Sequence, residues 1–292
     1  MKLFDGLETI VRTEVPLSPY TWLRLGGPAQ YFIEPNTQEQ LTEVIRRCRE
    51  NEIPARILGG GANLLVDDSG VRGAVIRLSG EEFTSVTFTD QGVKAGAAAD
   101  LSRLVLRTVR EGWSGMECLT GIPGTVGGAV RMNAGGSFGD IGNVVESVSL
   151  MDEDGVTFSR LRGDVVFGYR TTNINSKVIL GAEFRLVPDS PRRILNQVKQ
   201  IWIYKKNTQP LGTRNAGCVF KNPRGLSAGA MIDKAGLKGK RVGGAHVSEK
   251  HANFILADDG THASDVLKLI ALVRETVYKR WEVYLELEIE VW

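Results

Sequence analysis

The stretch from Cys118 to Gly139 constrains the fold more than any other part of the chain. It is rich in glycine, yet most of its remaining residues are apolar, so its composition is wrong for a flexible linker. Glycine removes the side chain and lets backbone N–H groups approach a ligand or a neighbouring segment closely. The stretch therefore predicts an ordered segment built around close backbone contacts.

Two segments of the first half have the features of phosphate-binding loops. The first, Leu58–Leu64, contains three consecutive glycines and follows a short predicted strand. The second, Gly121–Val130, predicts a helix that begins near Gly124, whose free N–H groups and positive dipole end would face a phosphate. For either loop alone, tight turns and close helix packing explain the glycines as well. Together they favour a nucleotide, without choosing FAD over another.

Neither loop matches a standard nucleotide motif. The first lacks the Gly-Lys-Ser/Thr of a P-loop, and Leu64 replaces the last glycine of the G-x-G-x-x-G fingerprint. Neutral backbone donors in place of lysines fit a buried diphosphate. The net charge of +2 gives no basic face of the kind that nucleic-acid-binding proteins need.

The cysteines and the chain ends limit the possible classes further. Cys48, Cys118 and Cys218 are odd in number and lack metal-ligand spacing, so we expect neither a disulfide framework nor a metal site. A reducing cytoplasm fits best. Residues 1–9 do not have the apolar core of a signal peptide, and no segment has the roughly 18 apolar residues of a membrane-spanning helix.

The periodicity predicts a mixed α and β chain. Helices are expected over 37–51, 100–112, from 190 onward and around 266–277, with Thr37 and Asp100 as N-caps and Gly112 as a stop. Strands are expected over 55–58, 74–78, 85–89, 93–97, 146–151, 156–161, 177–187 and 283–291. Residues 188–191 have the character of a domain boundary.

Several motifs, in order along nearly the whole chain, resemble the UDP-N-acetylenolpyruvoylglucosamine reductase family. They are Thr21–Gly27, Ile57–Val66, Gly121–Gly135, Phe167–Arg170, Ala216–Pro223, Lys250–Ile255 and Leu285–Ile289. The most specific of them are the glycine block Gly121–Gly135 and the Lys-His-Ala-Asn-Phe segment within Lys250–Ile255. The chain is similar to the shorter variant of the family, which lacks an extra tyrosine-bearing loop.

The resemblance implies an α+β fold. Its FAD-binding half, of the vanillyl-alcohol-oxidase type, has two subdomains over 1–78 and 79–189, and an α/β substrate-binding domain follows over 190–292. The implied reaction passes hydride from NADPH, through FAD, to the enolpyruvyl group of a UDP-sugar. It makes UDP-N-acetylmuramate for peptidoglycan. A cytoplasmic monomer that binds neither nucleic acid nor membrane is expected.

Three residues are carried over as catalytic. Arg170 is expected to hold the substrate carboxylate with its planar fork of donors, although an unplaced arginine more often forms a structural ion pair. Cys218 replaces the family's serine as proton donor, since a thiol with pKa of about 8.5 is mostly protonated at pH 7. Its alternative is a buried apolar thiol. Glu288 is expected to assist as acid, and its alternative is a solvated strand position.

The resemblance also implies cofactor and substrate contacts. The implied cofactor contacts are Gly59, Gly60, Gly61, Ala62, Asn63, Leu64, Gly121, Ile122, Pro123, Gly124, Thr125, Gly127, Gly128, Ala129 and Asn133. The implied substrate contacts are Tyr169, Lys206 and Asn222, although Lys205 and Lys206 fit a solvated helix end equally well. Ala62 stands where serine is common, and Thr171 and Thr172 stand where the family often has a serine. Asn253 and His251 either shape the site or form structural hydrogen bonds.

Two other functions stay open at this point. An FAD oxidase or dehydrogenase of another small substrate would keep the fold but not the motifs of the C-terminal third. A non-catalytic nucleotide-sugar-binding relative would tolerate the replacement of serine by Cys218, but it would not need Arg170 and Glu288.

Overall fold

In the computed structural model, which describes residues 3–292, three stretches of the chain contribute to each of two units. The first unit contains Met1–Thr13, Tyr31–Gly60 and Arg72–Tyr204, and the second contains Glu14–Gln30, Gly61–Val71 and Lys205–Trp292. The second unit therefore takes two segments from the N-terminal part of the chain. The three-part division expected at residues 78 and 189 stays a prediction.

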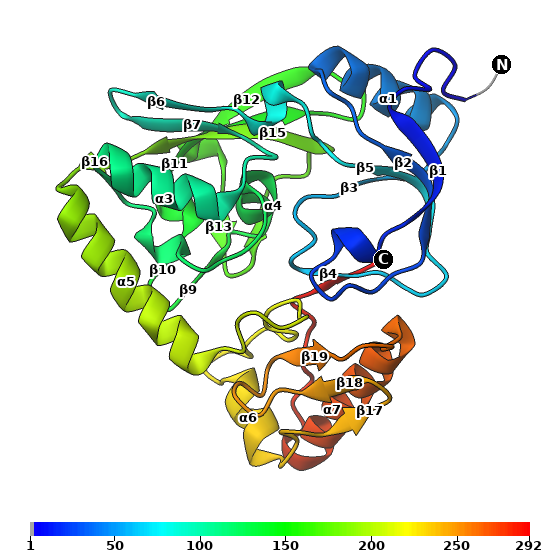
Figure 1. Cartoon of the computed structure of the whole chain (residues 1–292), viewed down its shortest axis with the longest axis vertical. Helices are drawn as coiled ribbons and strands as arrows, with labels where there is room; N and C mark the ends of the chain where they lie inside the picture. The colour runs from blue at the N-terminus through cyan, green and yellow to red at the C-terminus, as the bar shows by residue number, and fades with distance from the viewer. Residues whose placement is uncertain (1–2) are drawn as a thin grey trace. The chain divides into compact units, whose positions relative to one another are not determined.

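Helices and strands are interspersed along the chain (Figure 1). The helices are α1 (Gln38–Glu50), α2 (Glu81–Thr84), α3 (Leu101–Glu111), α4 (Val126–Arg131), α5 (Pro191–Thr208), α6 (Ala228–Lys234) and α7 (Ala263–Trp281), with short 3₁₀ turns at Ser18–Tyr20, Glu117–Leu119, Ile141–Asn143 and Arg162–Asp164. The longer strands are β1 (Val11–Pro16), β2 (Pro28–Ile33), β5 (Val71–Ile76), β6 (Val86–Thr89), β7 (Gly92–Gly96), β11 (Val145–Met151), β12 (Thr157–Leu161) and β15 (Val178–Arg185). The shorter strands are β3 (Ala55–Ile57), β4 (Leu64–Leu65), β8 (Trp113–Ser114), β9 (Gly135–Gly136), β10 (Gly139–Asp140), β13 (Phe167–Gly168), β14 (Thr171–Thr172), β16 (Val187–Pro188), β17 (Arg241–Val242), β18 (Ala245–Val247), β19 (Ile255–Ala257) and β20 (Glu290–Val291).

The cap signals predicted from the sequence are confirmed. The Thr37 side chain accepts from the backbone N of Gln40 at 3.3 Å at the start of α1. Asp100 accepts in the same way from Arg103 at 2.7 Å at the start of α3, and Gly112 ends that helix with a φ of +74°. Each of these contacts satisfies backbone groups that a helix end leaves without a partner.

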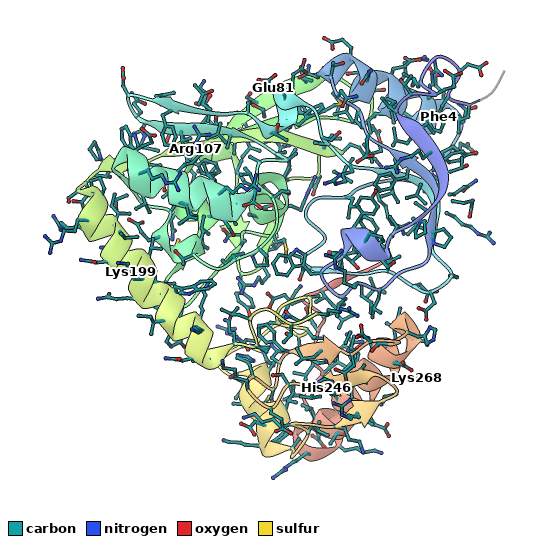
Figure 2. The ribbon with its side chains drawn as sticks, viewed as in Figure 1. Phe4, Glu81, Arg107, Lys199, His246 and Lys268 are labelled. Atoms are coloured by element: carbon teal, nitrogen blue, oxygen red, sulfur yellow. The ribbon has the colours of Figure 1, made fainter. Side chains whose placement is uncertain are left out.

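A five-stranded antiparallel sheet, in the order β12-β11-β15-β7-β6, forms the centre of the first unit. Helices α3 and α4 lie on the same side of this sheet (Figure 1). Arg107 of α3, labelled in Figure 2, places its guanidinium 5.4 Å from the ring centre of Phe88 on β6. A second sheet of this chain has the order β1-β2-β5-β3, with β3 and β5 parallel.

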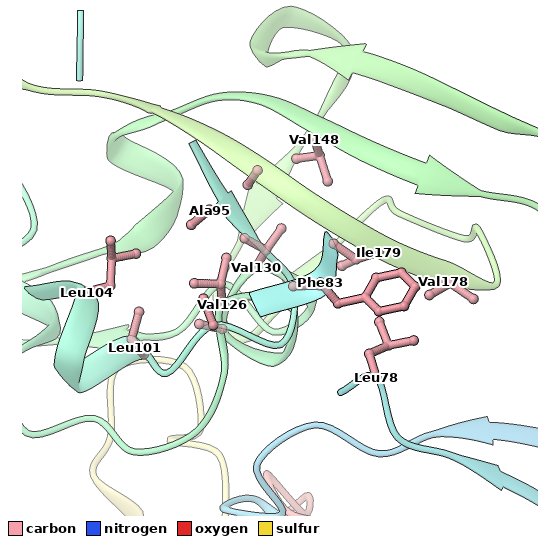
Figure 3. Close-up of a cluster of buried hydrophobic side chains, with 14 of the residues drawn as sticks. Leu78, Phe83, Ala95, Leu101, Leu104, Val126, Val130, Val148, Val178 and Ile179 are labelled. Atoms are coloured by element: carbon pink, nitrogen blue, oxygen red, sulfur yellow. The ribbon is translucent and has the colours of Figure 1, made fainter. Parts of the chain in front are cut away.

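Apolar side chains from the sheet and the two helices fill the space between them (Figure 3). The cluster shown there includes Leu78, Phe83, Ala95, Leu101, Leu104, Val126, Val130, Val148, Val178 and Ile179, all buried. Burial of such side chains contributes most of the stability of a fold. Here it also fixes the start of α4, which follows the glycine-rich turn.

The second unit is built around α7, whose apolar stripe packs against the hairpin β17-β18 and strand β19. The predicted stripe is confirmed, because Val266, Leu269, Ile270, Val273 and Val277 are all buried. Within residues 3–292, no helix combines the length and the apolar character that a membrane crossing requires.

The regular strand predicted over 283–291 is wrong for most of its length. Only Glu290–Val291 forms a strand, β20, which runs parallel to β4. The predicted alternation holds as far as Glu290, since Leu285 and Ile289 are buried while Glu286 and Glu290 are exposed, but Val291 is exposed as well. The segment pairs with short irregular stretches of backbone in place of one long neighbouring strand, so it stays irregular.

Candidate active site

Two glycine segments of the first unit, both predicted to bind phosphate, lie directly against each other. A Cβ added to Gly60 would lie 2.6 Å from Cα of Gly124, and one added to Gly59 would lie 2.8 Å from Oγ1 of Thr125. A side chain at either position would therefore push the two segments apart. We call Gly59, Gly60, Gly124 and Thr125 the glycine junction.

The turn that leads into α4 depends on glycine for its backbone conformation. Gly121 has a φ of +72° and Gly124 a φ of +112°, values that residues with side chains rarely adopt. Ile122 and Pro123 lie half-buried between them. The bare backbone of this turn is the surface that the sequence assigns to the cofactor.

The expectation that the first N–H groups of α4 are free to bind a phosphate is wrong for two of them. The N–H of Val126 donates to the carbonyl of Ala99 at 3.0 Å, and that of Gly127 donates to the carbonyl of Ala97 at 2.8 Å. A Cβ on Gly127 would lie 2.8 Å from Cβ of Ala97. Gly127 thus allows close packing, which is the alternative that the sequence left open.

The other residues assigned to the cofactor divide by exposure. Gly128 is exposed, and a Cβ there would make only an ordinary contact, 3.6 Å from Oγ1 of Thr125. Ala129 and Leu64 are buried, and Ala62 is half-buried. The assignment of this set to a cofactor stays a prediction, and it rests on the turns more than on the helix end.

The remainder of the first loop, from Gly61 onward, belongs to the second unit. Gly61 has a φ of +63°, and a Cβ there would lie 2.0 Å from the carbonyl oxygen of Tyr20. The side-chain Nδ2 of Asn63 donates to the carbonyl of Glu288 at 3.0 Å, and the N–H of Glu290 donates to the carbonyl of Asn63 at 2.9 Å. Asn63 therefore fixes the segment that carries Glu288.

Arg170 lies at the tip of a small hairpin in the first unit. Strands β13 and β14 pair Gly168 with Thr171, which leaves Tyr169 and Arg170 as the turn. Arg170 has a φ of +56°, a conformation that glycine usually occupies. Its guanidinium carbon lies 5.3 Å from the ring centre of Tyr169, whose side chain is exposed.

Asn133, assigned to the cofactor by resemblance, holds this hairpin with its side chain. Its Nδ2 donates to the carbonyl of Gly168 at 2.9 Å, and its Oδ1 accepts from the N–H of Gly142 at 3.0 Å. Asn133 is 4% exposed and has a φ of +47°. The nearby Arg131 donates to backbone carbonyls of Ile174 and Ser176, and burial lowers the pKa of its guanidinium.

In the second unit, the segments that carry Cys218 and Glu288 are hydrogen-bonded side by side. The N–H of Glu288 donates to the carbonyl of Val219 at 2.8 Å, and the N–H of Lys221 donates to the carbonyl of Glu286 at 2.9 Å. This antiparallel register places Glu288 opposite Val219, which is the residue that follows Cys218. The structure brings the backbone segments of these two predicted residues together, and it places Arg170 in the other unit.

Asn253 lies on the other side of the Cys218 segment. The N–H of Val219 donates to the carbonyl of Asn253 at 2.8 Å, while the Asn253 side chain accepts from the N–H of Phe220 at 3.0 Å and donates to its carbonyl at 2.8 Å. We call the hydrogen-bonded set Asn253, Val219, Phe220 and Glu288 the backbone ladder. The structural alternative that the sequence left open for Asn253 is therefore realised.

His251, from the same motif, accepts a backbone hydrogen bond. Its Nδ1 accepts from the N–H of Asn253 at 3.3 Å, which requires an unprotonated Nδ1. Burial is the main cause that lowers the pKa of His251 below its ordinary value. Its ring also makes an edge-to-face contact with Phe254, with 4.9 Å between ring centres.

Two residues predicted to contact the substrate, Asn222 and Lys206, already form hydrogen bonds within the protein. Oδ1 of Asn222 accepts from the N–H of Ala228 at 3.0 Å, at the start of α6. Lys206 is exposed near the end of α5, and its carbonyl accepts from the Lys250 ammonium. Lys205, which the sequence groups with Lys206 as a solvated helix end, is instead 7% exposed. A lysine is so rarely buried that its burial marks a specific partner, but the helical pattern alone does not single it out.

The three cysteines differ in environment. Cys48 is buried on α1, and desolvation raises the pKa of its thiol to about 11. Cys118 and Cys218 are partly exposed, and all three are free thiols. Over residues 3–292, no three histidine, cysteine or carboxylate side chains gather in a way that would hold a metal ion.

Two family models match the chain. Residues 29–159 match an FAD binding domain, and residues 209–292 match the C-terminal domain of UDP-N-acetylenolpyruvoylglucosamine reductase. The glycine junction lies in the first match, and Cys218 and Glu288 lie in the second. These matches confirm the predicted α+β fold with an FAD-binding half of the vanillyl-alcohol-oxidase type.

Full-length relatives agree with the two models. The chain is 41% identical over 284 residues to UDP-N-acetylenolpyruvoylglucosamine reductase 2 of Symbiobacterium thermophilum, which covers 97% of this chain and 92% of that protein. It is 41% identical over 292 residues to the reductase of Moorella thermoacetica, which covers 100% of this chain and 96% of that protein. The crystal structure of the reductase from Thermus caldophilus superimposes with a TM-score of 0.85 at 41% identity, covering 97% of this chain and 99% of that one.

The geometry of the first unit fits FAD. At the glycine junction two segments pack directly against each other, which sets two backbone turns without side chains next to each other, the kind of surface that binds a diphosphate through N–H groups. The two positive-φ glycines of the turn, Gly121 and Gly124, keep its backbone bare. The fit therefore comes from backbone and from the absence of Cβ atoms.

Proposed function

Since the chain belongs to the UDP-N-acetylenolpyruvoylglucosamine reductase family, we propose that it reduces the enolpyruvyl group of UDP-N-acetylglucosamine enolpyruvate with NADPH. The product, UDP-N-acetylmuramate, is a precursor of peptidoglycan. The observation that carries this function is the register that sets Cys218 and Glu288 on adjacent segments. An unrelated substrate would not require both groups at this point of the C-terminal domain.

Bound FAD supplies the hydride chemistry of this reaction. The side chains of the chain have to hold the substrate and manage charge and protons. Negative charge develops next to the substrate carboxylate when hydride arrives at the methylene carbon. The guanidinium of Arg170 holds that carboxylate and stabilises the charge, because it is planar, bidentate and always protonated.

Cys218 gives the proton that completes the reduction. A thiol is more acidic than the serine hydroxyl that the family usually has here, and it is mostly protonated at neutral pH. Glu288, on the segment paired with the one that carries Cys218, acts as a second acid or polarises the group that receives the proton. Both roles rest on the register, since backbone hydrogen bonds fix where the two segments lie.

Substrate contacts outside the reacting group are assigned to Tyr169, Asn222 and a lysine near the end of α5. Lys206 is the residue that the motif suggests for the diphosphate, and its exposed side chain is able to move. Nδ2 of Asn222 is the end of that amide assigned to the substrate, since Oδ1 accepts from Ala228. We also propose that the protein acts in the cytoplasm as a monomer.

A visible absorption spectrum tests the function. The purified protein is expected to be yellow, to lose its flavin absorbance with NADPH, and to regain it with the enolpyruvyl UDP-sugar under anaerobic conditions. Cys218→Ala should still bleach with NADPH but lose substrate turnover, and Cys218→Ser should keep much of both. Normal turnover by Cys218→Ala would remove the assigned proton donor. Rapid oxygen consumption with a small alcohol, without a response to the UDP-sugar, would favour an oxidase of another substrate. Absence of bound flavin would favour a non-catalytic binding protein.

A further inference from the structure

Asn253 forms a set of hydrogen bonds that reproduces a missing β-strand. Its Oδ1 and Nδ2 pair with the N–H and the carbonyl of one residue, Phe220, at 3.0 and 2.8 Å. Its own carbonyl accepts from the N–H of Val219 at 2.8 Å. One residue thus satisfies three backbone groups of the two residues that follow Cys218.

The neighbourhood makes these hydrogen bonds important. Asn253 is 3% exposed, and Val219 and Phe220 are equally buried, so water does not replace a lost partner there. Gly217, which precedes Cys218, has a φ of +76°, so the chain turns sharply just before the thiol. The direction in which the Cys218 segment leaves this turn depends on what holds its next two residues.

One of these two residues, Val219, connects Asn253 to Glu288. The carbonyl of Val219 accepts from the N–H of Glu288, while the N–H of Val219 donates to Asn253. Both polar atoms of the Asn253 side chain bond to Phe220, on the segment that carries Cys218.

We propose that Asn253 is a positioning residue: through Val219 and Phe220 it sets the Cys218 thiol relative to Glu288 for proton transfer. This inference rests on the proposed function, because it gives Cys218 a part in the reaction. It also predicts a property of the thiol that is measurable without any reaction.

The first measurement separates the two half-reactions of the holoenzyme. Asn253→Asp keeps the size and the acceptor but replaces the donor with a carboxylate oxygen that faces the Phe220 carbonyl. Flavin bleaching by NADPH should change by less than about twofold, while reoxidation by the UDP-substrate slows about 100-fold, as misplaced proton transfer does. Asn253→Ser is the second variant should the aspartate prevent folding.

The second measurement follows alkylation of Cys218 by iodoacetamide in a Cys118→Ser background. Loss of the Asn253 hydrogen bonds should raise the alkylation rate about tenfold, the factor expected for one lost hydrogen bond. Val273→Ala is the matched control, since it removes buried apolar contacts in the same unit. It should lower the melting temperature and leave both alkylation and reoxidation unchanged.

The double variant decides how Asn253 acts. If Asn253 works through the thiol, Asn253→Asp added to Cys218→Ala should change reoxidation by less than about twofold. Two effects that multiply, or an unchanged alkylation rate in Asn253→Asp, would overturn the inference. Normal turnover by Cys218→Ala alone would instead refute the proposed proton donor. Faster alkylation in that case would show that Asn253 holds the segment and that the assigned chemistry is wrong.

Discussion

The glycine junction of the first unit and the backbone ladder of the second position their segments by opposite means. At the junction, Gly60 and Gly124 approach because neither has a side chain. In the ladder, the side-chain amide of Asn253 replaces a strand partner that the irregular segment lacks, and next to the ladder the amide of Asn63 does the same for Glu288. The first arrangement is sensitive to any added atom, and the second to the loss of particular hydrogen-bonding groups.

This contrast matches what each region has to hold. A cofactor that stays bound through many turnovers is served by a bare backbone surface, which contributes many weak donors at fixed positions. A proton donor has to keep one distance and one direction, and buried amide pairs give a single geometry. Substitutions in the two regions should therefore have different kinetic signatures.

Arg170 gives the largest expected effect, because it combines a backbone conformation typical of glycine with a side chain that has a specific role. Its backbone is left-handed, with a φ of +56°, while its side chain is assigned to the substrate carboxylate. Arg170→Gly should relieve about 1 kcal/mol of backbone strain, so the melting temperature should hold or rise. Turnover should fall about 100- to 1000-fold, the range for a lost charge-stabilising donor, with flavin bleaching unchanged.

Stopped-flow absorbance and thermal unfolding of Arg170→Gly and Arg170→Lys check this prediction. Lysine keeps the charge but loses the planar fork, so it should recover only part of the activity. A stable Arg170→Gly variant with normal turnover would limit Arg170 to the shape of the hairpin.

Gly60 gives the next largest effect. In Gly60→Val the added Cβ would lie 2.6 Å from Cα of Gly124, and the two segments would have to separate. Overpacking of this kind costs about 1–3 kcal/mol, which corresponds to flavin binding weakened by roughly 10- to 100-fold. Gly136→Ala, in the glycine-rich stretch Cys118–Gly139 that also contains Gly124, is the control, since nothing lies within 4 Å of its Cβ position. Equal flavin affinity in the two variants, measured by fluorescence titration, would refute the role of the junction.

Much of the fold follows from local signals, and the exceptions have a common cause. Caps such as Thr37 and Asp100 act within one turn of helix, so the sequence predicts them correctly. The strand expected over 283–291 is mostly irregular, because its partners are short stretches far away in sequence. The periodicity of apolar residues predicts which side chains are buried, but it does not predict the length of the strand with which the segment pairs.

The candidate site shows the same limit. The motifs identify Arg170, Cys218 and Glu288, but nothing local indicates that the Asn133 side chain holds Gly168 or that Asn63 holds Glu288. The sequence also predicts free N–H groups at the start of α4, but two of them pair with the carbonyls of Ala97 and Ala99, which only the tertiary fold brings there. A residue's type predicts its chemistry, and its partners depend on the fold.

Asn63 tests the boundary between the two regions, with a smaller expected effect. It belongs to a loop assigned to the cofactor, yet its side chain donates to the Glu288 carbonyl at 3.0 Å. Asn63→Ala should lower substrate turnover about tenfold, the factor for one lost hydrogen bond, and leave the flavin content of the purified protein unchanged. Loss of flavin with normal turnover after reconstitution would move Asn63 to the cofactor side of the comparison.

His251 gives the smallest effect and extends the comparison to pH. Its Nδ1 accepts from the N–H of Asn253, and burial holds its pKa below the ordinary value of 6.5. The unfolded chain therefore binds a proton more readily, so stability is full above about pH 6.5 and falls as the pH drops from there towards the folded pKa. His251→Gln removes this titration, so its melting temperature should fall less than that of the natural protein between pH 7.5 and 5.5.

Because protonation also breaks a contact of Asn253, Cys218 alkylation corrected for thiolate content should rise over the same interval in the natural protein only. An equal rise in the alkylation rate of His251→Gln would show that the backbone ladder does not depend on the protonation of His251.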